Sequence, residues 1–247
     1  MKRLIYLVPL LCVLCVGQGI LIRSGAAVAS GNTWTTSSGW SATGVSSGQI
    51  SCTNAPGQQC PAVTVPATVA GDLLYVEQIY GGTGGQLSSG SGGGTWVFPA
   101  NCNNSIASAG SLSCGYVLSA TGGVTSITMT LNAGNAVELH FRSYHPSSTT
   151  AVAETVPAAT TNAACSNNCT TPTVTLTGTS DVVIAAMANQ LSNCSVAAPY
   201  GNYAAPSGDG IADNLNTASG TGATFSQASV CPSTNNGIAT LSTVAFK

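Results

Sequence analysis

Apolar and polar residues alternate along residues 135–145, which read N-A-V-E-L-H-F-R-S-Y-H. Val137, Leu139 and Phe141 fall on one side of an extended chain, and the residues between them fall on the other. This two-residue period is typical of a strand with one face on a hydrophobic core and the other in water. We therefore interpret the stretch as a central strand of an all-β domain.

Other strand-forming runs follow one another along the chain, separated by segments rich in Gly, Pro, Asn and Asp. Beyond the N-terminal leader, no window of the sequence has a helical period. We expect loops at 81–94, 149–171 and 191–215. The predicted strands are 62–66, 73–80, 95–98, 116–119, 124–131, 136–144, 173–177, 181–189, 221–226 and 237–246.

The pattern contains a weak internal repeat. Residues 61–76 and 172–185 each hold a short strand, a turn that ends in an aspartate and a long apolar strand. The two aspartates are Asp72 and Asp181. Two such halves favour an all-β, two-sheet sandwich of Greek-key or jelly-roll type.

Residues 1–29 have the features of a signal peptide. Two basic residues precede an apolar run, and Ala27-Val28-Ala29 suits cleavage before Ser30. The alternative is an uncleaved membrane anchor, because residues 20–22 extend the apolar stretch towards spanning length. We expect a Ser/Thr/Gly-rich arm or edge strand over 30–60 and the sandwich over 61–247, in a secreted or cell-surface protein.

Few charged residues follow the leader. Two bases, Arg142 and Lys247, stand against seven acids, which gives residues 30–247 a formal charge of −5. A nucleic-acid partner is disfavoured, because no basic patch is available to neutralise phosphates. Attraction to anionic lipid is disfavoured for the same reason.

Eight cysteines follow the leader. An even number in an exported chain indicates four disulfides that staple the sandwich. A zinc site is disfavoured, because the spacings do not form paired C-x-x-C knuckles. Proximity along the chain suggests the pairs Cys52–Cys60, Cys102–Cys114, Cys165–Cys169 and Cys194–Cys231.

Glu138, His140 and Arg142 share the polar face of the strand at 135–145. In steps of two residues they lie roughly 7 Å apart. One interpretation makes them a polar site in which His140 acts as acid or base between a carboxylate and a guanidinium. The alternative, which we favour, is an ion pair on the solvated side of the sheet.

Five aromatic residues are candidates for stacking on a sugar. Such binding needs aromatic faces with amide and hydroxyl groups and no charge, which agrees with the composition. The alternative is that these residues cover the ends of the sandwich, because aromatic residues usually serve burial. The five are Trp34, Trp40, Trp96, Tyr200 and Tyr203.

The segment 207–214, S-G-D-G-I-A-D-N, is the best candidate for a metal site. Asp209, Asp213 and Asn214 offer the hard oxygen ligands that calcium prefers. The alternative is an ordinary Asp/Gly/Asn turn. Calcium is the one cofactor that the sequence suggests.

Several motifs, taken in order, resemble a β-sandwich domain that is widespread in secreted bacterial proteins. The resemblance covers roughly 61–247 and implies a fold, not an activity. Two features depart from the pattern: Ser143 stands where many such domains have Glu, and the eight cysteines are additional. The matching motifs are Val63-Thr64-Val65-Pro66, Gly71–Leu74, Thr95-Trp96, Ser143-Tyr144, Asp181–Ile184 and Ala245–Lys247.

The preferred interpretation is a non-catalytic structural or adhesive module outside the cell. Its expected partners are glycans, cell-surface or matrix components, or further copies of itself joined through uncharged sheet edges. The alternative is a carbohydrate-binding module that uses exposed aromatics. A third is a glycan-active enzyme, which needs two facing carboxylates about 5–10 Å apart. Glu77 and Glu138 would qualify only if their strands were neighbours.

Overall fold

The fold is taken from a computed structural model, in which Gly31–Lys247 forms one compact unit. The predicted leader lies outside the described residues. Within them, no helix has the length and apolar character needed to cross a membrane. The described residues are 32–53, 57–80, 84–106, 110–148, 151, 153–164, 168–188, 195–204, 209–226 and 238–247.

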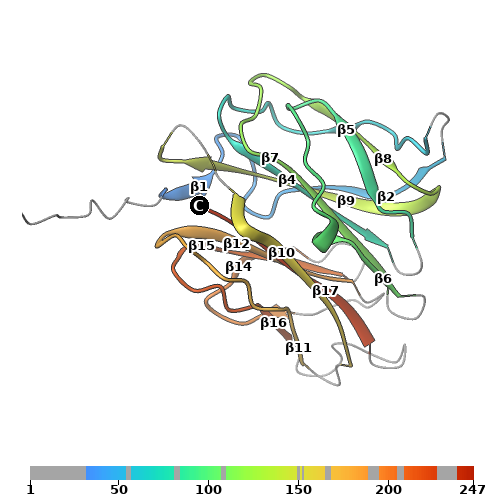
Figure 1. The fold of residues 1–247 in the computed structure, drawn as a ribbon. Helices are drawn as coiled ribbons and strands as arrows, with labels where there is room; N and C mark the ends of the chain where they lie inside the picture. Colours follow the sequence, from blue (N-terminus) through green and yellow to red (C-terminus); the bar gives the residue numbers. More distant parts are fainter. Residues whose placement is uncertain are drawn as a thin grey trace, which may run out of the picture. The chain divides into compact units, whose positions relative to one another are not determined.

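The first half of the unit builds a large and a small sheet (Figure 1). The strands of the large sheet are β1 (Trp34–Thr36), β2 (Val45–Cys52), β4 (Leu73–Tyr80), β6 (Asn104–Ile106), β7 (Gly110–Val117) and β9 (Asn135–Pro146). The strands of the small sheet are β3 (Val63–Thr64), β5 (Leu87–Ser91) and β8 (Ser126–Leu131). The large sheet has the order β1–β9–β4–β7–β6, with β2 also on β9, and the small sheet the order β3–β8–β5. A turn of 3-10 helix, η1 (Ala100–Cys102), precedes β6.

The second half also builds a large and a small sheet. The strands of the large sheet are β10 (Ala153–Ala164), β12 (Asp181–Ala188), β14 (Gly201–Ala204), β15 (Gly210–Thr217) and β17 (Ile238–Phe246). The strands of the small sheet are β11 (Asn168–Thr170), β13 (Ser195–Val196) and β16 (Thr224–Ser226). The large sheet has the order β10–β17–β12–β15–β14, and the small sheet the order β11–β16–β13.

The two halves share one topology. Every strand from β2 to β9 corresponds to the strand numbered eight higher, and every pairing among β2 to β9 recurs in the second half, whereas the pairing of β1 with β9 has no counterpart among the described strands there. Thus β9–β4–β7–β6 matches β17–β12–β15–β14, and β3–β8–β5 matches β11–β16–β13. The internal repeat in the sequence therefore corresponds to two complete sandwiches, each with its own pair of sheets.

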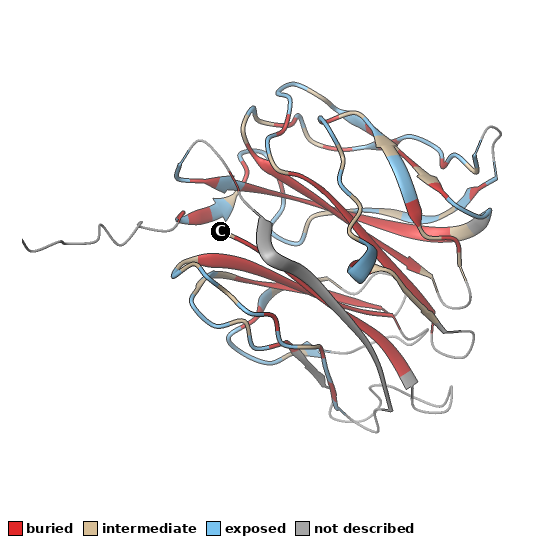
Figure 2. Cartoon of the chain, in the orientation of Figure 1, coloured by how far each residue is buried: buried red, intermediate tan, exposed pale blue. Residues whose placement is uncertain are grey.

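Three hydrophobic clusters separate the four sheets. The central core lies between the large sheets and includes Tyr75, Ile184 and Phe246. The first outer core lies between the sheets of the first half, and the second outer core between those of the second half. Figure 2 shows buried residues running along the strands of both large sheets. Because β4 is buried on both faces, its sequence L-L-Y-V-E-Q-I-Y is nearly continuously apolar.

The predicted all-β class, with antiparallel sheets and disulfides, is confirmed. The predicted loops are wrong in part. Segment 81–94 contains β5, segment 149–171 contains β10 and β11, and segment 191–215 contains β13, β14 and most of β15. These strands are polar or rich in Ala and Gly, so they lack a strand signature of their own. They form because neighbouring strands offer them backbone donors and acceptors.

Two predicted disulfides, Cys52–Cys60 and Cys102–Cys114, are present. Cys169 is also disulfide-bonded, while Cys165, Cys194 and Cys231 lie outside the described residues. Disulfides of this kind are typical of proteins made for an oxidising, extracellular-type environment.

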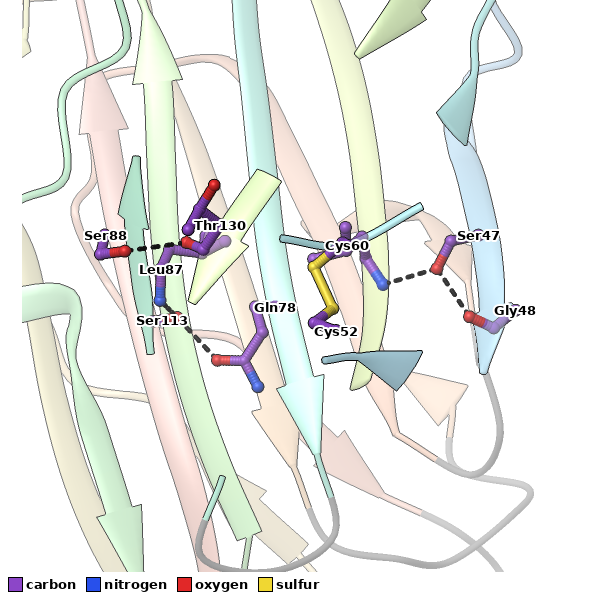
Figure 3. Close-up of a disulfide and its surroundings, with 10 residues drawn as sticks. Ser47, Gly48, Cys52, Cys60, Gln78, Leu87, Ser88, Ser113 and Thr130 are labelled. Atoms are coloured by element: carbon purple, nitrogen blue, oxygen red, sulfur yellow. Dashed lines mark hydrogen bonds between the residues drawn. A yellow bond between two sulfur atoms is a disulfide. The ribbon is translucent and has the colours of Figure 1, made fainter. Parts of the chain in front are cut away.

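Hydroxyl groups supplement the disulfides as cross-links in the first half (Figure 3). Ser113 donates to Gln78 at 2.7 Å and accepts from the backbone N–H of Leu87 at 2.9 Å, which ties β7 to β4 and to β5. Ser47 accepts from the backbone N–H of Leu139 at 2.9 Å and donates to the carbonyl of Gly48. The contacts of Ser113 are buried and use neutral groups, so they avoid the cost of burying charge.

Candidate functional site

The polar face of β9 lies inside the protein. Val137, Leu139 and Phe141 pack in the first outer core. Glu138, His140 and Arg142 face the other way, towards the second half, and all three are buried. The expectation that this face is solvated is therefore wrong, because the second large sheet covers the side of β9 that an isolated sandwich would expose.

Arg142 joins the two halves. Its Nη1 donates to Oδ2 of Asp213 at 2.7 Å, and its Nη2 donates to the carbonyl oxygens of Asn202 and Ile211 at 2.7 and 3.1 Å. Asp213 also accepts from the Tyr144 hydroxyl and from the Asn202 side-chain amide, each at 2.8 Å. Burial raises the pKa of Asp213, and Arg142 and the hydrogen bonds offset part of that rise. The carboxylate is thus fully engaged by groups of the protein.

His140 is held neutral by its surroundings. Burial, and to a lesser degree the charge of Arg142, lowers the pKa of His140 to about 3. Among the described residues, neither ring nitrogen has a hydrogen-bond partner. The nearest carboxylate oxygen belongs to Glu138, 3.9 Å from Nε2. A histidine with this pKa is a poor acid or base near neutral pH.

Glu77 stands opposite His140, because β4 and β9 are neighbours in register. Burial raises the pKa of Glu77 to about 8, against the opposite effect of hydrogen bonds from Tyr75 and Ser242. Glu138 is opposite Ile79 on the same strand pair, so it lies diagonal to Glu77. Both carboxyl groups are buried. Glycan cleavage needs carboxylates in an open cleft, and this placement does not supply one.

Glu77 also lies beside a sulfur pair. One of its carboxylate oxygens and the Sγ atoms of Cys102 and Cys114 are within 4.8 Å of one another. Three such groups would suit a soft metal if the sulfurs were thiolates. The two sulfurs are joined in a disulfide, so in this form they are not metal ligands.

The expected calcium ligands are not brought together. Asp213 and Asn214 lie in β15, so the predicted turn or loop is a strand over these residues. Adjacent residues of a strand point to opposite faces, and Asp213 is occupied by Arg142. Asp209 immediately precedes the strand and is buried.

The five aromatic candidates are divided among three cores. Trp34 lies in the central core, Trp40 and Trp96 belong to the first outer core, and Tyr200 and Tyr203 belong to the second. Trp34, Trp40 and Tyr200 are buried. These five residues do not form one exposed, coplanar row.

Phe98, which is not among the aromatic candidates from the sequence, lies beside Trp96. Their ring centroids are 6.3 Å apart and their planes are inclined by 20°. Both side chains are partly exposed, and Val97 between them is exposed. The i, i+2 spacing of Trp96 and Phe98 was the available signal, because it places both rings on one side of an extended chain.

A second missed pattern is G-V-S-S-G at 44–48, which has the spacing of a hydrolase nucleophile motif. Ser46 lies opposite His140 on β2, and its hydroxyl donates to Glu138. The motif requires a sharp strand-to-helix turn. Here it lies along an edge strand with a bulge, so it is not a nucleophile elbow.

In the described part of the chain, charged side chains lie almost entirely inside the protein. Arg142 is buried, and so are six of the seven acids, namely Asp72, Glu77, Glu138, Asp181, Asp209 and Asp213. The side chain of the seventh, Glu154, is outside the described part. Of the bases, Lys247 is partly exposed, and the exposed His145 pairs with Asp72 at 2.7 Å. The described surface therefore consists mainly of hydroxyl, amide and backbone groups.

Comparison with protein-family models, curated proteins and solved structures finds no match to this chain.

Proposed function

We propose that this protein is a non-catalytic, extracellular structural or adhesive module that binds neutral partners through an uncharged surface. The observation that carries the proposal is the location of charge. Six acids and Arg142 are buried, while the described surface offers hydroxyl, amide and backbone groups. Such groups bind hydroxyl-rich polymers without ionic contacts.

The interior supports a structural role. Glu77, His140 and Arg142, which could serve catalysis, lie between two packed sheets and are each at most 3% exposed. Arg142 and Asp213 form an ion pair with one another. This arrangement uses polar residues to join two sandwiches and does not present them to a substrate.

The disulfides and the motif resemblance support a location outside the cell. Cys52–Cys60 and Cys102–Cys114 suit an oxidising compartment. The order of motifs over 61–247 resembles β-sandwich domains of secreted bacterial proteins, and residues 1–29 read as a signal peptide. We include secretion and membership of that group of domains in the proposal.

The test is adsorption of oxidised 30–247 to uncharged and charged solids at low and high salt. We expect retention on neutral polymers such as cellulose or chitin, or self-association in sedimentation experiments, with little effect of salt, because few exposed charges are available for screening. Retention only on ion exchangers, abolished by salt, would overturn the proposal. A chain that stays monomeric and binds none of the solids would overturn it too.

A further inference from the structure

We infer that Trp96 and Phe98 form a binding site for the apolar faces of sugar units in a neutral polysaccharide. This inference rests on the proposed function, since it names the partner and the site of adhesion. We call Trp96, Val97 and Phe98 the aromatic strip. Val97, between Trp96 and Phe98, is 41% exposed, and in an extended chain its side chain points to the side opposite the two rings.

The strip is a rigid extension of the first large sheet. Val97 and Tyr116 exchange two backbone hydrogen bonds, of 2.8 and 2.9 Å, which hold the strip against β7. The indole N–H of Trp96 donates to the carbonyl of Gly92 at 2.7 Å. The direction of the indole is therefore set before any ligand arrives, which lowers the entropic cost of binding.

Both rings rest on glycine backbone. A Cβ at Gly115 would lie 2.5 Å from Cε1 of Phe98, and a Cβ at Gly90 would lie 3.0 Å from Cγ of Trp96. Each ring thus occupies space that a side chain would take at any other residue. Both residues pack against the first outer core and remain partly exposed.

The two rings are oriented for successive contacts. Carbon atoms in contact are about 3.5–4.0 Å apart, so centroids 6.3 Å apart indicate lateral displacement and not full overlap. Their planes differ by only 20°. Two nearly parallel, laterally displaced rings suit neighbouring units of a polymer better than one compact ligand.

The surroundings of the strip select a neutral, hydroxyl-rich partner. The exposed residues beside it in the chain and on β5 include Ser88, Ser89, Ser91, Gly94 and Thr95, which carry hydroxyl groups or no side chain, and Ala100, which carries a methyl group. Hydroxyl groups can bond the equatorial hydroxyls of a sugar while its C–H face packs on the rings. An acidic or basic partner would find no opposite charge among these residues.

The corresponding position in the second half is closed. The registers of Val97 with Tyr116 and of Gly201 with Asp213 make Trp96 equivalent to Tyr200. Tyr200 is buried, and its hydroxyl donates to the carbonyl of Thr221 at 2.8 Å. The shared position covers the end of an outer core in both halves, but only the first half leaves it open. We therefore expect one polysaccharide site in each molecule.

The test is depletion of oxidised 30–247 by insoluble neutral polysaccharides, with Trp96→Ala and Phe98→Ala compared with the parent protein. Each substitution should weaken retention by roughly tenfold, which is the upper range for loss of one aromatic contact. Trp96→Phe should retain most of the binding. The matched control is Ile50→Ala, which removes another partly buried residue of the same outer core and should leave retention unchanged.

Tryptophan fluorescence gives a second readout that does not depend on the solid. Trp34 and Trp40 are buried and Trp96 is partly exposed, so a neutral quencher should act mainly on Trp96. Soluble oligosaccharides from the retaining polymer should protect that emission, and Trp96→Phe should lose the protected component.

The possible outcomes distinguish failure of the sugar site from failure of the proposed function. If the strip variants are retained like the parent protein, the site is wrong and adhesion stands. If they lose self-association and polysaccharide retention is unaffected, the strip is a contact between copies, which also overturns the sugar site. If no neutral polysaccharide retains the parent protein, the sugar site is wrong, and self-association alone decides the proposed function.

Discussion

Arg142 on β9 and Asp213 on β15 form a buried ion pair, 2.7 Å from Nη1 to Oδ2, that links the two halves of the chain. Each side chain is 1% exposed. The pair lies at the central core, where two otherwise separate sandwiches meet. Its hydrogen bonds to Asn202, Ile211 and Tyr144 replace most of the hydrogen bonds to water that the two charged groups lose on burial.

Arg142→Met should destabilise the protein by about 3–5 kcal/mol, because it leaves the Asp213 carboxylate buried without its cation. Urea unfolding of the oxidised chain measures the loss. The double variant Arg142→Met/Asp213→Leu should recover most of it, since apolar groups of similar volume can replace a buried pair. Lys247→Met, at the other base beyond the leader, should change stability little. Equal losses in the single and double variants would show that charge pairing is not the cause.

Glu77 should make the protein less stable as pH rises. Its pKa is about 8 in the folded state, against an ordinary value of 4.5. Between these pH values the folded state keeps a proton that the unfolded state has released. The free energy of unfolding should therefore fall with rising pH, by up to about 1.4 kcal/mol per unit. Glu77→Gln should lack this slope. Its free energy of unfolding relative to that of the parent protein should therefore increase between about pH 5 and 8, the range set by the pKa shift. Parallel stability curves would contradict the assignment.

His140 should make the protein less stable at acid pH. Its pKa is about 3 in the folded state, against an ordinary value of 6.5. As pH falls through this interval the unfolded state takes up a proton and the folded state does not, so stability falls with falling pH. His140→Gln should remove that contribution. Chemical denaturation at a series of pH values tests this, and an unchanged acid limb in His140→Gln would refute it.

The strands with strong alternation could be predicted from the sequence. The period-two pattern of β9 and the apolar run of β4 are both strands as predicted. The all-β class follows from such segments. Strand β5, with the sequence L-S-S-G-S, could not be predicted in this way, because its partner β8 and the contact of Gly90 with Trp96 determine its conformation.

The burial of the polar face could not be read from alternation. The period of β9 shows that Arg142 lies on one face and Phe141 on the other, but not what covers each face. A second sheet that carries Asp213 covers the face of Arg142. The internal repeat around Asp72 and Asp181 was the available indication, because each of two duplicated sandwiches can cover an outer face of the other. Motif order alone could not distinguish two sheets from two sandwiches.

The duplicated architecture predicts that neither half is stable alone. A chain of residues 31–148 contains the first outer core and both described disulfides, but it exposes Tyr75 and Leu112 of the central core and leaves Arg142 without Asp213. We expect it to aggregate or self-associate, because an apolar face of this kind is not tolerated in water. Co-expressed with residues 149–247, it should form a one-to-one complex that co-purifies through a tag on either half. Arg142→Met in the first half should weaken the complex. A monomeric first half with cooperative unfolding would show that the central core is a dispensable contact between two independent domains.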